Sequence, residues 1–334
     1  MSQVILIDHK SHIPIYKQIV FSICDSIDNG LLKPNDAIPS VNKVAATFSL
    51  ARGSVFMAYN ELKSLGIIKA IPGKGFFVSS IKTQMHHNIF LLFTTFSTYK
   101  EKLYGALTHS LKGRCNVDIY FHHYNISIFE QLINQYAGQY NVFIIMPMSH
   151  ERVPEILSVL NPQATYMLDI GYKEYGDSFA GVYQNFENDI FTILKKKIAL
   201  IRKYRRLILV HNNNFRSREI IVGFERFAAE SPIESIIVSS EKLKDIRKHD
   251  AFITTEDSEL VTIIRAAKKN KWVIGKDIGI LSYNETALKS IISDGISTIT
   301  TDFNLMGKQM AEMILNREQK TIENKFVMID RKSF

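Results

Sequence analysis

In the stretch from Ser40 to Val78, a first helical pattern begins after Pro39, where apolar residues recur every three or four positions from Val41 to Phe48. Ser40 stands where a side chain can cap the exposed amides of a first turn. A second helical pattern runs through residues 55–65, and Gly66 follows where a left-handed terminating residue is expected. These residues predict two short amphipathic helices joined by a tight turn.

Two strand-like segments, residues 67–70 and 76–78, follow the second helix and flank Ile71-Pro72-Gly73-Lys74-Gly75. The glycines supply backbone freedom for a turn, and Lys74 puts a positive charge at its tip. Two helices and a basic hairpin in this order are typical of a winged helix-turn-helix, which places its second helix in the DNA major groove. The alternative is an unrelated helical domain with an ordinary Gly-Lys-Gly turn.

Small and polar residues mark the surface predicted to face DNA. The second helix starts with a cation and small groups, which permit close approach to bases and phosphates. The amide of Asn42 has the donor and acceptor that pair with an adenine edge. The predicted DNA-binding residues are Ser40, Asn42, Lys43, Arg52, Gly53, Ser54, Lys74 and Gly75.

From residue 88 onward, short apolar runs such as 142–148 and 165–169 alternate with helical segments. The cycle restarts with a long helix predicted over residues 187–203 and continues to residue 316. Repeated strand and helix predict parallel sheets covered on both faces, arranged as two α/β halves with a ligand cleft at the carboxyl ends of the strands. We therefore predict an α/β protein with a DNA-binding domain at residues 1–80, a polar linker at 81–87 and an effector-binding and dimerisation domain at 88–334.

Composition and charge fit this organisation. The 334 residues are 46% hydrophobic, enough for packed cores, and carry a net charge of +8. Residues 1–82 hold nine Lys and Arg against five Asp and Glu, so the smaller domain is the more basic. No apolar run is long enough to span a bilayer and the polar start is no signal peptide, so we expect a cytoplasmic protein without a membrane partner. Cys24 and Cys115 are interpreted as reduced core residues, with a redox sensor as the alternative.

Polar residues at strand ends or helix starts of the second domain form a candidate sugar site. A sugar needs paired donors and acceptors, an arginine that bonds two hydroxyls and an aromatic face. The predicted effector-binding residues are Phe96, Asp169, Tyr183, Arg218, Glu256, Asn284 and Phe303, with Arg216 as the alternative to Arg218. Each polar residue has an alternative role as a cap or turn residue, and Phe303 as hinge core. Acidic and amide groups favour a neutral sugar over a phosphorylated one.

Residues 11–79 resemble the DNA-binding domain of the GntR family of bacterial transcriptional regulators. The resemblance is carried by Pro14-Ile15-Tyr16-Lys17-Gln18-Ile19, Tyr59-Asn60-Glu61-Leu62 and Gly73-Lys74-Gly75-Phe76-Phe77-Val78, among other segments. In that family an acidic residue and an arginine usually follow Pro-Ser, and the recognition helix has a further basic position; here these positions are Val41, Asn42 and Phe56. The resemblance therefore implies that Arg52 is the retained arginine contact and that the operator differs from the usual one.

Residues 88–334 are similar to the periplasmic-binding-protein-type effector domain of LacI-family sugar repressors. The more specific segments are residues 277–284 and 299–307. The resemblance places Asp169, Glu256 and Asn284 on effector-contact positions. It implies a two-lobed, periplasmic-binding-protein-like domain whose bound sugar weakens operator binding.

An enzyme is the competing class. A pyridoxal-phosphate domain would need more than the 247 residues from Asn88 onward. The sequence lacks a phosphate loop, a nucleophile elbow and a His-Glu-x-x-His motif, and the pairs His86-His87 and His122-His123 lack further spaced ligands. We therefore expect no enzymatic activity, no cofactor and no metal.

Together these observations predict a homodimeric repressor of a sugar-utilisation operon. Its expected partners are double-stranded operator DNA and a small monosaccharide that releases it, with L-fucose and L-arabinose as the first candidates. The alternative is a GntR-type regulator whose second domain only dimerises or senses a non-sugar metabolite.

Overall fold

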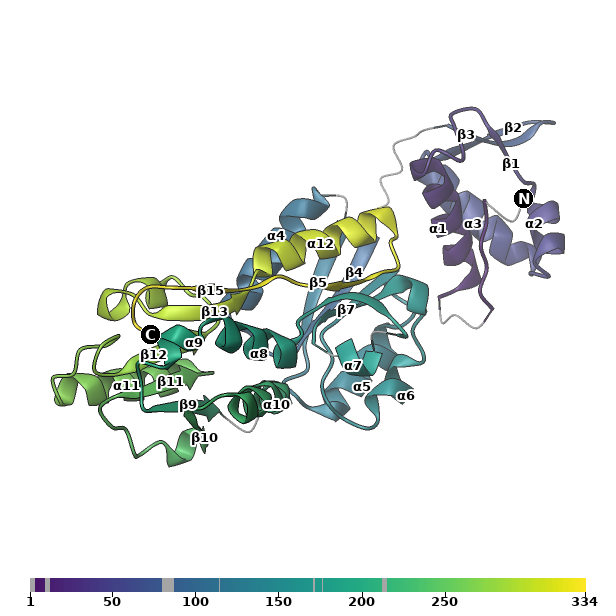
Figure 1. Ribbon diagram of the computed structural model, residues 1–334. Coiled ribbons are helices and arrows are strands. Elements are labelled where there is room, and N and C mark those ends of the chain that lie inside the picture. The colour runs from purple at the N-terminus through teal and green to yellow at the C-terminus, as the bar shows by residue number, and fades with distance from the viewer. Residues whose placement is uncertain are drawn as a thin grey trace. The chain divides into compact units, whose positions relative to one another are not determined.

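The N-terminal residues fold into three helices and a small antiparallel sheet (Figure 1). The structure is a computed structural model that describes residues 4–9, 13–79, 87–113, 115–170, 172–175, 177–211 and 215–334. The strands of the small sheet lie in the order β1-β3-β2. The elements are α1 (Ile15–Asp28), β1 (Ala37–Ile38), α2 (Val41–Thr47), α3 (Arg52–Ser64), β2 (Ile68–Ile71) and β3 (Gly75–Val78).

The predicted helix-turn-helix and hairpin are confirmed. The Ser40 side chain accepts a hydrogen bond from the backbone N–H of Lys43 (3.3 Å) and so caps α2. Helix α3 buries four residues on one face, as its apolar period requires: Val55, Ala58, Tyr59 and Leu62. Gly66 ends this helix with φ +69°, and the β2–β3 turn contains Gly73 and Gly75 with φ +74° and +103°. These positive φ values explain why glycine stands at the helix end and in the turn.

Tyr59 connects three parts of this domain. Its side chain is fully buried, and its hydroxyl donates a hydrogen bond to the backbone oxygen of Pro39 (2.5 Å), just before α2. Its ring packs edge-to-face against Phe76 of β3, with centroids 4.9 Å apart. Burial raises the pKa of the Tyr59 hydroxyl well above its usual range, so the hydroxyl stays a donor. The Tyr59 side chain therefore fixes the start of α2, helix α3 and the β2–β3 hairpin, which forms the wing, to one another.

Helix α1 supplies the other half of this core through buried residues such as Ile19 and Ile23. Cys24 lies on the same buried face, and burial raises the pKa of its thiol to about 12, with Asp28 and Glu61 contributing. A thiol that stays protonated is a poor nucleophile, which supports the interpretation of Cys24 as a reduced core residue. Cys115 is also a free thiol and is half-buried.

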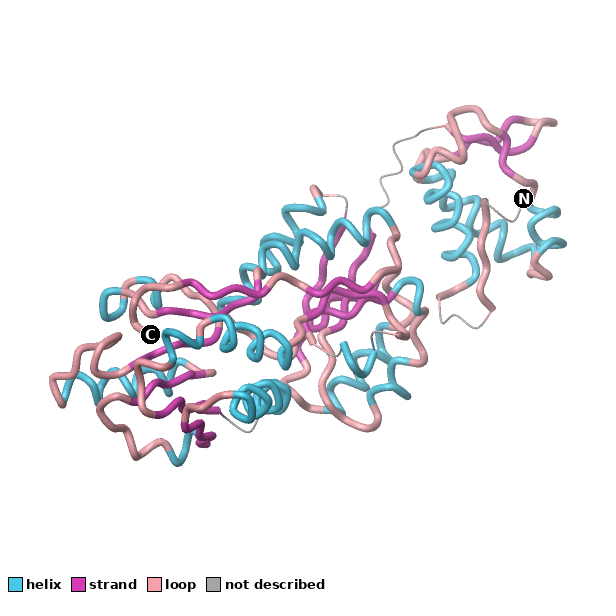
Figure 2. The backbone as a smooth tube through the Cα atoms, in the orientation of Figure 1, coloured by secondary structure: helices cyan, strands magenta, loops and turns pink. Residues whose placement is uncertain are grey.

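The larger part of the chain contains two six-stranded sheets (Figure 2). The first sheet has the order β14-β8-β7-β6-β4-β5 and the second has the order β10-β9-β11-β12-β13-β15. Strand β4 begins at His87, one residue before the predicted start of this domain, and residues 81–86 of the predicted linker lie outside the described residues. The strands are β4 (His87–Phe93), β5 (Cys115–Phe121), β6 (Val142–Ile145), β7 (Thr165–Asp169), β8 (Ala180–Tyr183), β9 (Arg206–His211), β10 (Glu234–Ser239), β11 (Asp250–Thr254), β12 (Gly279–Tyr283), β13 (Ser297–Thr301), β14 (Thr321–Glu323) and β15 (Phe326–Ile329).

The helices between these strands follow the predicted alternation. They are α4 (Thr98–Leu111), α5 (Ile126–Tyr136), α6 (Val153–Leu157), α7 (Tyr172–Tyr175), α8 (Phe186–Lys196), α9 (Ile198–Ile201), α10 (Phe215–Glu230), α11 (Asp257–Lys269) and α12 (Phe303–Asn316). The continuous helix predicted over residues 187–203 is wrong. Lys197 leaves the helical conformation (φ −103°, ψ 15°), and its N–H closes the end of α8 on Ile193 and Leu194. The apolar period persists across the break because Ile201 of α9 is still buried.

The sheets are not built from two halves in simple succession. The chain passes between them three times, because β14 joins the first sheet beside β8 and β15 returns to the second beside β13. Strand β15 is antiparallel to β13, so the second sheet is not purely parallel as predicted. Strand β15 follows β14 after a short connection, and α12 and β14 separate it in the chain from its antiparallel partner β13.

Asp189 is a buried carboxyl group in the first turns of α8. Among the described residues its Oδ2 atom has no hydrogen-bond partner. Burial, with a contribution from the nearby Glu323, raises the pKa of Asp189 to about 7. The folded protein therefore keeps this group protonated at pH values where the unfolded chain has lost the proton.

This shift predicts a pH-dependent stability. Between about pH 4 and 7 the folded state holds one proton more than the unfolded state, so the contribution of Asp189 falls by up to about 1.4 kcal/mol per pH unit as the pH rises. We expect Asp189→Asn to flatten the decline in the free energy of unfolding from pH 5 to pH 7, measured by urea denaturation. The control is Asp177→Asn at an exposed carboxyl. Equal slopes for wild type and Asp189→Asn would contradict the assignment.

Candidate DNA-binding surface and effector site

The predicted DNA-binding residues come from three neighbouring parts of the small domain. Ser40, Asn42 and Lys43 are exposed at the start of α2. Arg52 and Gly53 are exposed in the first turn of α3, where Ser54 is half-buried, and Lys74 and Gly75 are exposed in the turn of the hairpin. The structure thus leaves seven of the eight residues exposed, and it gives Ser40 a capping role as well.

The electrostatics of this surface favour an anion. The first turn of α3 contains no acidic residue, so the positive end of the helix dipole is not compensated there. Within the part of the chain that the structure describes, Lys43, Arg52 and Lys74 form no ion pair. These three exposed cations are available for phosphate or base contacts.

The predicted effector residues all follow the carboxyl end of a strand or begin the next helix. Phe96 follows β4, Asp169 ends β7 and Tyr183 ends β8, and these three strands belong to the first sheet. The other four follow strands of the second sheet: Arg218 in the first turn of α10, Glu256 before α11, Asn284 after β12 and Phe303 at the start of α12.

Asp169 is a fixed, buried acceptor. It is fully buried, and the side-chain amide of Gln184 donates a hydrogen bond to it. The backbone N–H of Gln184 also bonds the backbone oxygen of Asp169 (2.8 Å). Asp169 adopts φ +73°, in the left-handed region that non-glycine residues seldom occupy. Backbone strain of this kind occurs at ligand sites, and the effector-binding role of Asp169 stays a prediction.

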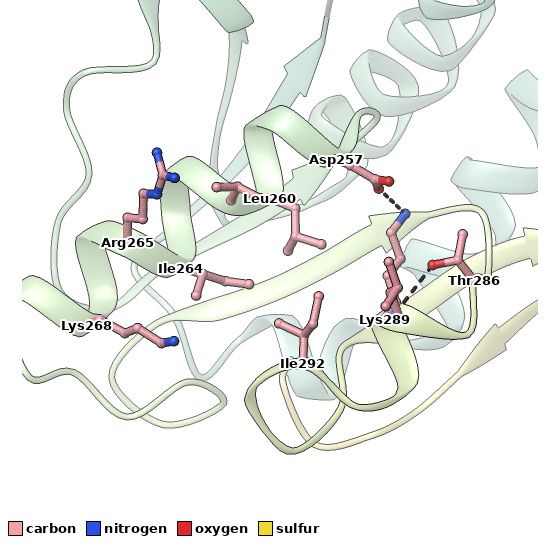
Figure 3. A pocket seen from close by; sticks show the side chains of 10 residues that line it. Asp257, Leu260, Ile264, Arg265, Lys268, Thr286, Lys289 and Ile292 are labelled. Carbon is pink, nitrogen blue, oxygen red and sulfur yellow. Dashed lines mark hydrogen bonds and ion pairs between the residues drawn. The ribbon is translucent and has the colours of Figure 1, made fainter. Parts of the chain in front are cut away.

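Asn284 also has a left-handed backbone, with φ +61°. Its loop is held by Lys289, a buried cation that is not among the predicted site residues. The Lys289 Nζ donates to the backbone oxygens of Tyr283 (2.7 Å) and Asn284 (3.1 Å) and lies 2.9 Å from Oδ1 of Asp257 (Figure 3). Lys289 thereby connects the loop of Asn284 to the start of α11, where Glu256 stands.

The three aromatic candidates have very different exposures. Phe96 is 72% exposed. Tyr183 is buried, and its hydroxyl donates to the backbone oxygen of Phe179 (3.0 Å). Phe303 is buried and stacks on Tyr99 with centroids 4.6 Å apart. Of these three residues, Phe96 alone is exposed.

The two remaining polar candidates, Glu256 and Arg218, are both exposed. Glu256 is exposed at the amino end of α11, where its backbone N–H bonds the buried Glu259 carboxylate (3.0 Å). Arg218 is exposed on α10, and the side chain of its alternative, Arg216, lies outside the described residues.

A groove of about 310 Å³ lies beside α11 and the loop that follows Asn284 (Figure 3). None of the seven predicted effector residues lines it. Apolar side chains dominate the groove, and Leu288 and the adjacent Ile291 are largely exposed. The lining residues are Asp257, Leu260, Val261, Ile264, Arg265, Lys268, Thr286, Leu288, Lys289 and Ile292.

Two features are absent from the described residues. No helix there combines the length and the apolar character that a bilayer crossing demands. No group of three or more His, Cys, Asp or Glu side chains there is arranged to hold a metal ion.

Comparison with known proteins matches both parts of the chain. Residues 15–78 match the model of the bacterial regulatory proteins of the gntR family, and residues 195–334 match the model of the periplasmic binding protein-like domain. The chain carries a GntR-type DNA-binding domain followed by a periplasmic-binding-protein-like domain. The geometry above therefore belongs to two modules, with the exposed cations on the GntR-type domain and the strand-end residues on the other.

Individual relatives match a short part of the chain each. The HTH-type transcriptional repressor YtrA of Bacillus subtilis is 37% identical over 75 residues, which are 22% of this chain and 58% of that repressor. The arabinose metabolism transcriptional repressor of Geobacillus stearothermophilus is 37% identical over 70 residues, 21% of this chain and 19% of that repressor. Both alignments span less than two thirds of the relative.

The periplasmic-binding-protein-like domain has solved structural neighbours that are LacI-type repressors. A dimeric Lac repressor superimposes with a TM-score of 0.62 at 14% identity, covering 74% of this chain and 98% of that protein. At this identity the similarity establishes the fold. It agrees with the predicted two-lobed α/β architecture, whose sheets are mainly parallel.

Proposed function

We propose that this protein is a transcriptional repressor of a sugar-utilisation operon that binds a palindromic operator as a homodimer in the cytoplasm. The observation that carries the proposal is the exposed, unpaired cationic surface at the start of α3 in a GntR-type domain. Cations at the amino end of a recognition helix provide phosphate and base contacts. Both relatives described above are named as repressors.

The proposed effector is a small neutral sugar bound by the periplasmic-binding-protein-like domain. Strand-end acceptors and amides, such as Asp169, Glu256 and Asn284, match the hydroxyl groups of a monosaccharide. L-Arabinose is the first candidate, because one relative is named as an arabinose metabolism repressor, and L-fucose is the second. The sugar acts by binding more tightly to the form of the dimer that releases DNA, and the loss of operator affinity equals this difference.

An apolar surface supports the proposed homodimer. The groove beside α11 is bordered by Leu288 and Ile291, whose side chains stand largely in water. A second copy of the chain would remove this apolar surface from solvent.

The DNA-binding role is tested by Arg52→Ala. Loss of one base or phosphate contact from an exposed arginine should weaken operator binding by about 1–3 kcal/mol. The operator comes from selection among random duplexes, and affinity is measured by fluorescence anisotropy at fixed salt. Arg202→Ala, at an exposed arginine of the second domain, should leave the affinity unchanged. Unaltered binding by Arg52→Ala would place the DNA contact elsewhere.

The effector role is tested by operator titration with a panel of monosaccharides and sugar phosphates. We expect L-arabinose or L-fucose to weaken operator binding by wild type, and Asp169→Asn to require more sugar while binding operator normally. Asn keeps the size of the buried side chain and removes its charge. If no sugar changes the affinity, a second domain that only dimerises, or that senses a non-sugar metabolite, becomes the better model.

The dimer surface is tested by Ile291→Glu. A carboxylate at this exposed apolar position should dissociate the dimer without unfolding the chain, because charge is costly to bury in an interface. Sedimentation velocity gives the oligomeric state. Val222→Glu, at a partly exposed apolar residue of α10, is the matched control and should remain dimeric. A dimeric Ile291→Glu protein would move the interface to another face.

A further inference from the structure

Helix α3 presents apolar side chains to water on the face turned away from the core. Phe56 and Met57 are each 54% exposed, and neither contributes to the core of the GntR-type domain. The residues that α3 contributes to the core are Val55, Ala58, Tyr59 and Leu62. An exposed aromatic ring beside an exposed methionine has no role in holding this domain together.

Phe56 is adjacent to the cation that carries the proposed DNA contact. It follows Arg52 by four positions, and Asn60 follows Phe56 by four more; all three side chains are exposed. Residues four apart lie next to each other on a helix surface. The outer face of α3 therefore displays a guanidinium, an aromatic ring and an amide in a single row.

The glycine at position 53 indicates that the surface of another molecule approaches this row of side chains closely. A Cβ atom at Gly53 would meet no described heavy atom within 4 Å, so packing within the domain does not require glycine there. Glycine in a helix is less favourable than alanine. Its presence one turn before Met57 is explained if an external surface packs directly against the backbone of the first turn.

The charges around this row of side chains indicate that the external surface is DNA. Lys43, Arg52 and Lys74 are exposed cations, and the first turn of α3 has no acidic residue. Of the groups that base pairs present in the major groove, the C5-methyl of thymine is the apolar one, and phenylalanine side chains pack against it. An aromatic ring between a cation and an amide therefore matches a thymine flanked by polar base edges.

We propose that Phe56 is a specificity-determining residue that selects thymine in the operator by packing against its C5-methyl group in the major groove. The inference rests on the proposed operator-binding function. It makes Phe56 a base-reading residue beside Arg52, with Met57 extending the apolar contact.

The test is a double-mutant cycle that removes the thymine methyl group from the DNA and the Phe56 ring from the protein, separately and together. The full-length protein first selects its operator from random duplexes. Each thymine in the selected duplex is then replaced singly by deoxyuridine, which lacks only the C5-methyl. We expect one thymine per half-site at which uracil weakens binding about fourfold, the factor for burial of one methyl-sized group.

The protein variants identify the side chain that reads this methyl group. Phe56→Ala should bind the thymine and uracil duplexes equally, and Phe56→Leu should keep the preference for thymine. Leu65→Ala removes an apolar side chain that is 56% exposed at the other end of α3, and it should behave as wild type. Coupling seen with Phe56→Ala separates a direct contact from an effect of thymine on DNA shape.

Three results would overturn the proposal. They are a selected operator without thymine, tolerance of uracil at every position, and a thymine preference that survives in Phe56→Ala. In each of these cases the proposed operator-binding function would remain supported. A selection that enriches no sequence would instead reject the operator-binding function, and the inference with it.

Discussion

The geometry of the DNA-binding surface depends on the buried side chain of Tyr59. Its hydroxyl reaches the backbone oxygen of Pro39 and its ring contacts Phe76, so the start of α2, the recognition helix and the wing are fixed to each other at one point. A reader of base edges must hold its side chains in a narrow range of positions, because hydrogen bonds weaken steeply with misalignment. The outward face of α3 is therefore placed by a contact on its inward face, within a core that excludes water.

The second domain uses strand ends in a comparable way. Parallel strands bring the residues that follow them to one edge of a sheet, so side chains far apart in sequence become neighbours in the sheet order. Asp169 and Asn284 both leave their strands with a left-handed backbone, and each is held by a buried polar group: Gln184 for the first and Lys289 for the second. The rigid sheets thus support positions that the backbone alone would not favour.

Much of this architecture could be predicted from local patterns, because each core-facing helix has its own apolar period. The period of α3, the cap at Ser40 and the left-handed Gly66 were correctly predicted for this reason. The role of Lys289 could not be predicted, because a lysine in a polar stretch is usually solvated. Its ion pair is with a carboxylate of α11 that is distant in sequence. The break in the helix at Lys197 could not be predicted from the sequence, because the apolar residues keep helical spacing across it. The exchange of β14 and β15 between sheets depends on long-range pairing, which short strands do not encode locally.

The exchanged strands have a consequence for how the protein is synthesised. Residues 321–329 supply β14 at the edge of the first sheet and β15 at the edge of the second. Neither sheet can acquire its last edge strand until this segment has left the ribosome. The GntR-type domain, in contrast, is complete once residue 78 has emerged. Nascent chains would therefore carry a folded DNA reader before either sheet of the effector module is finished, with the edges beside β8 and β13 exposed in the meantime. A chaperone that shields unpaired strand edges would have its longest opportunity to act on this protein during that interval.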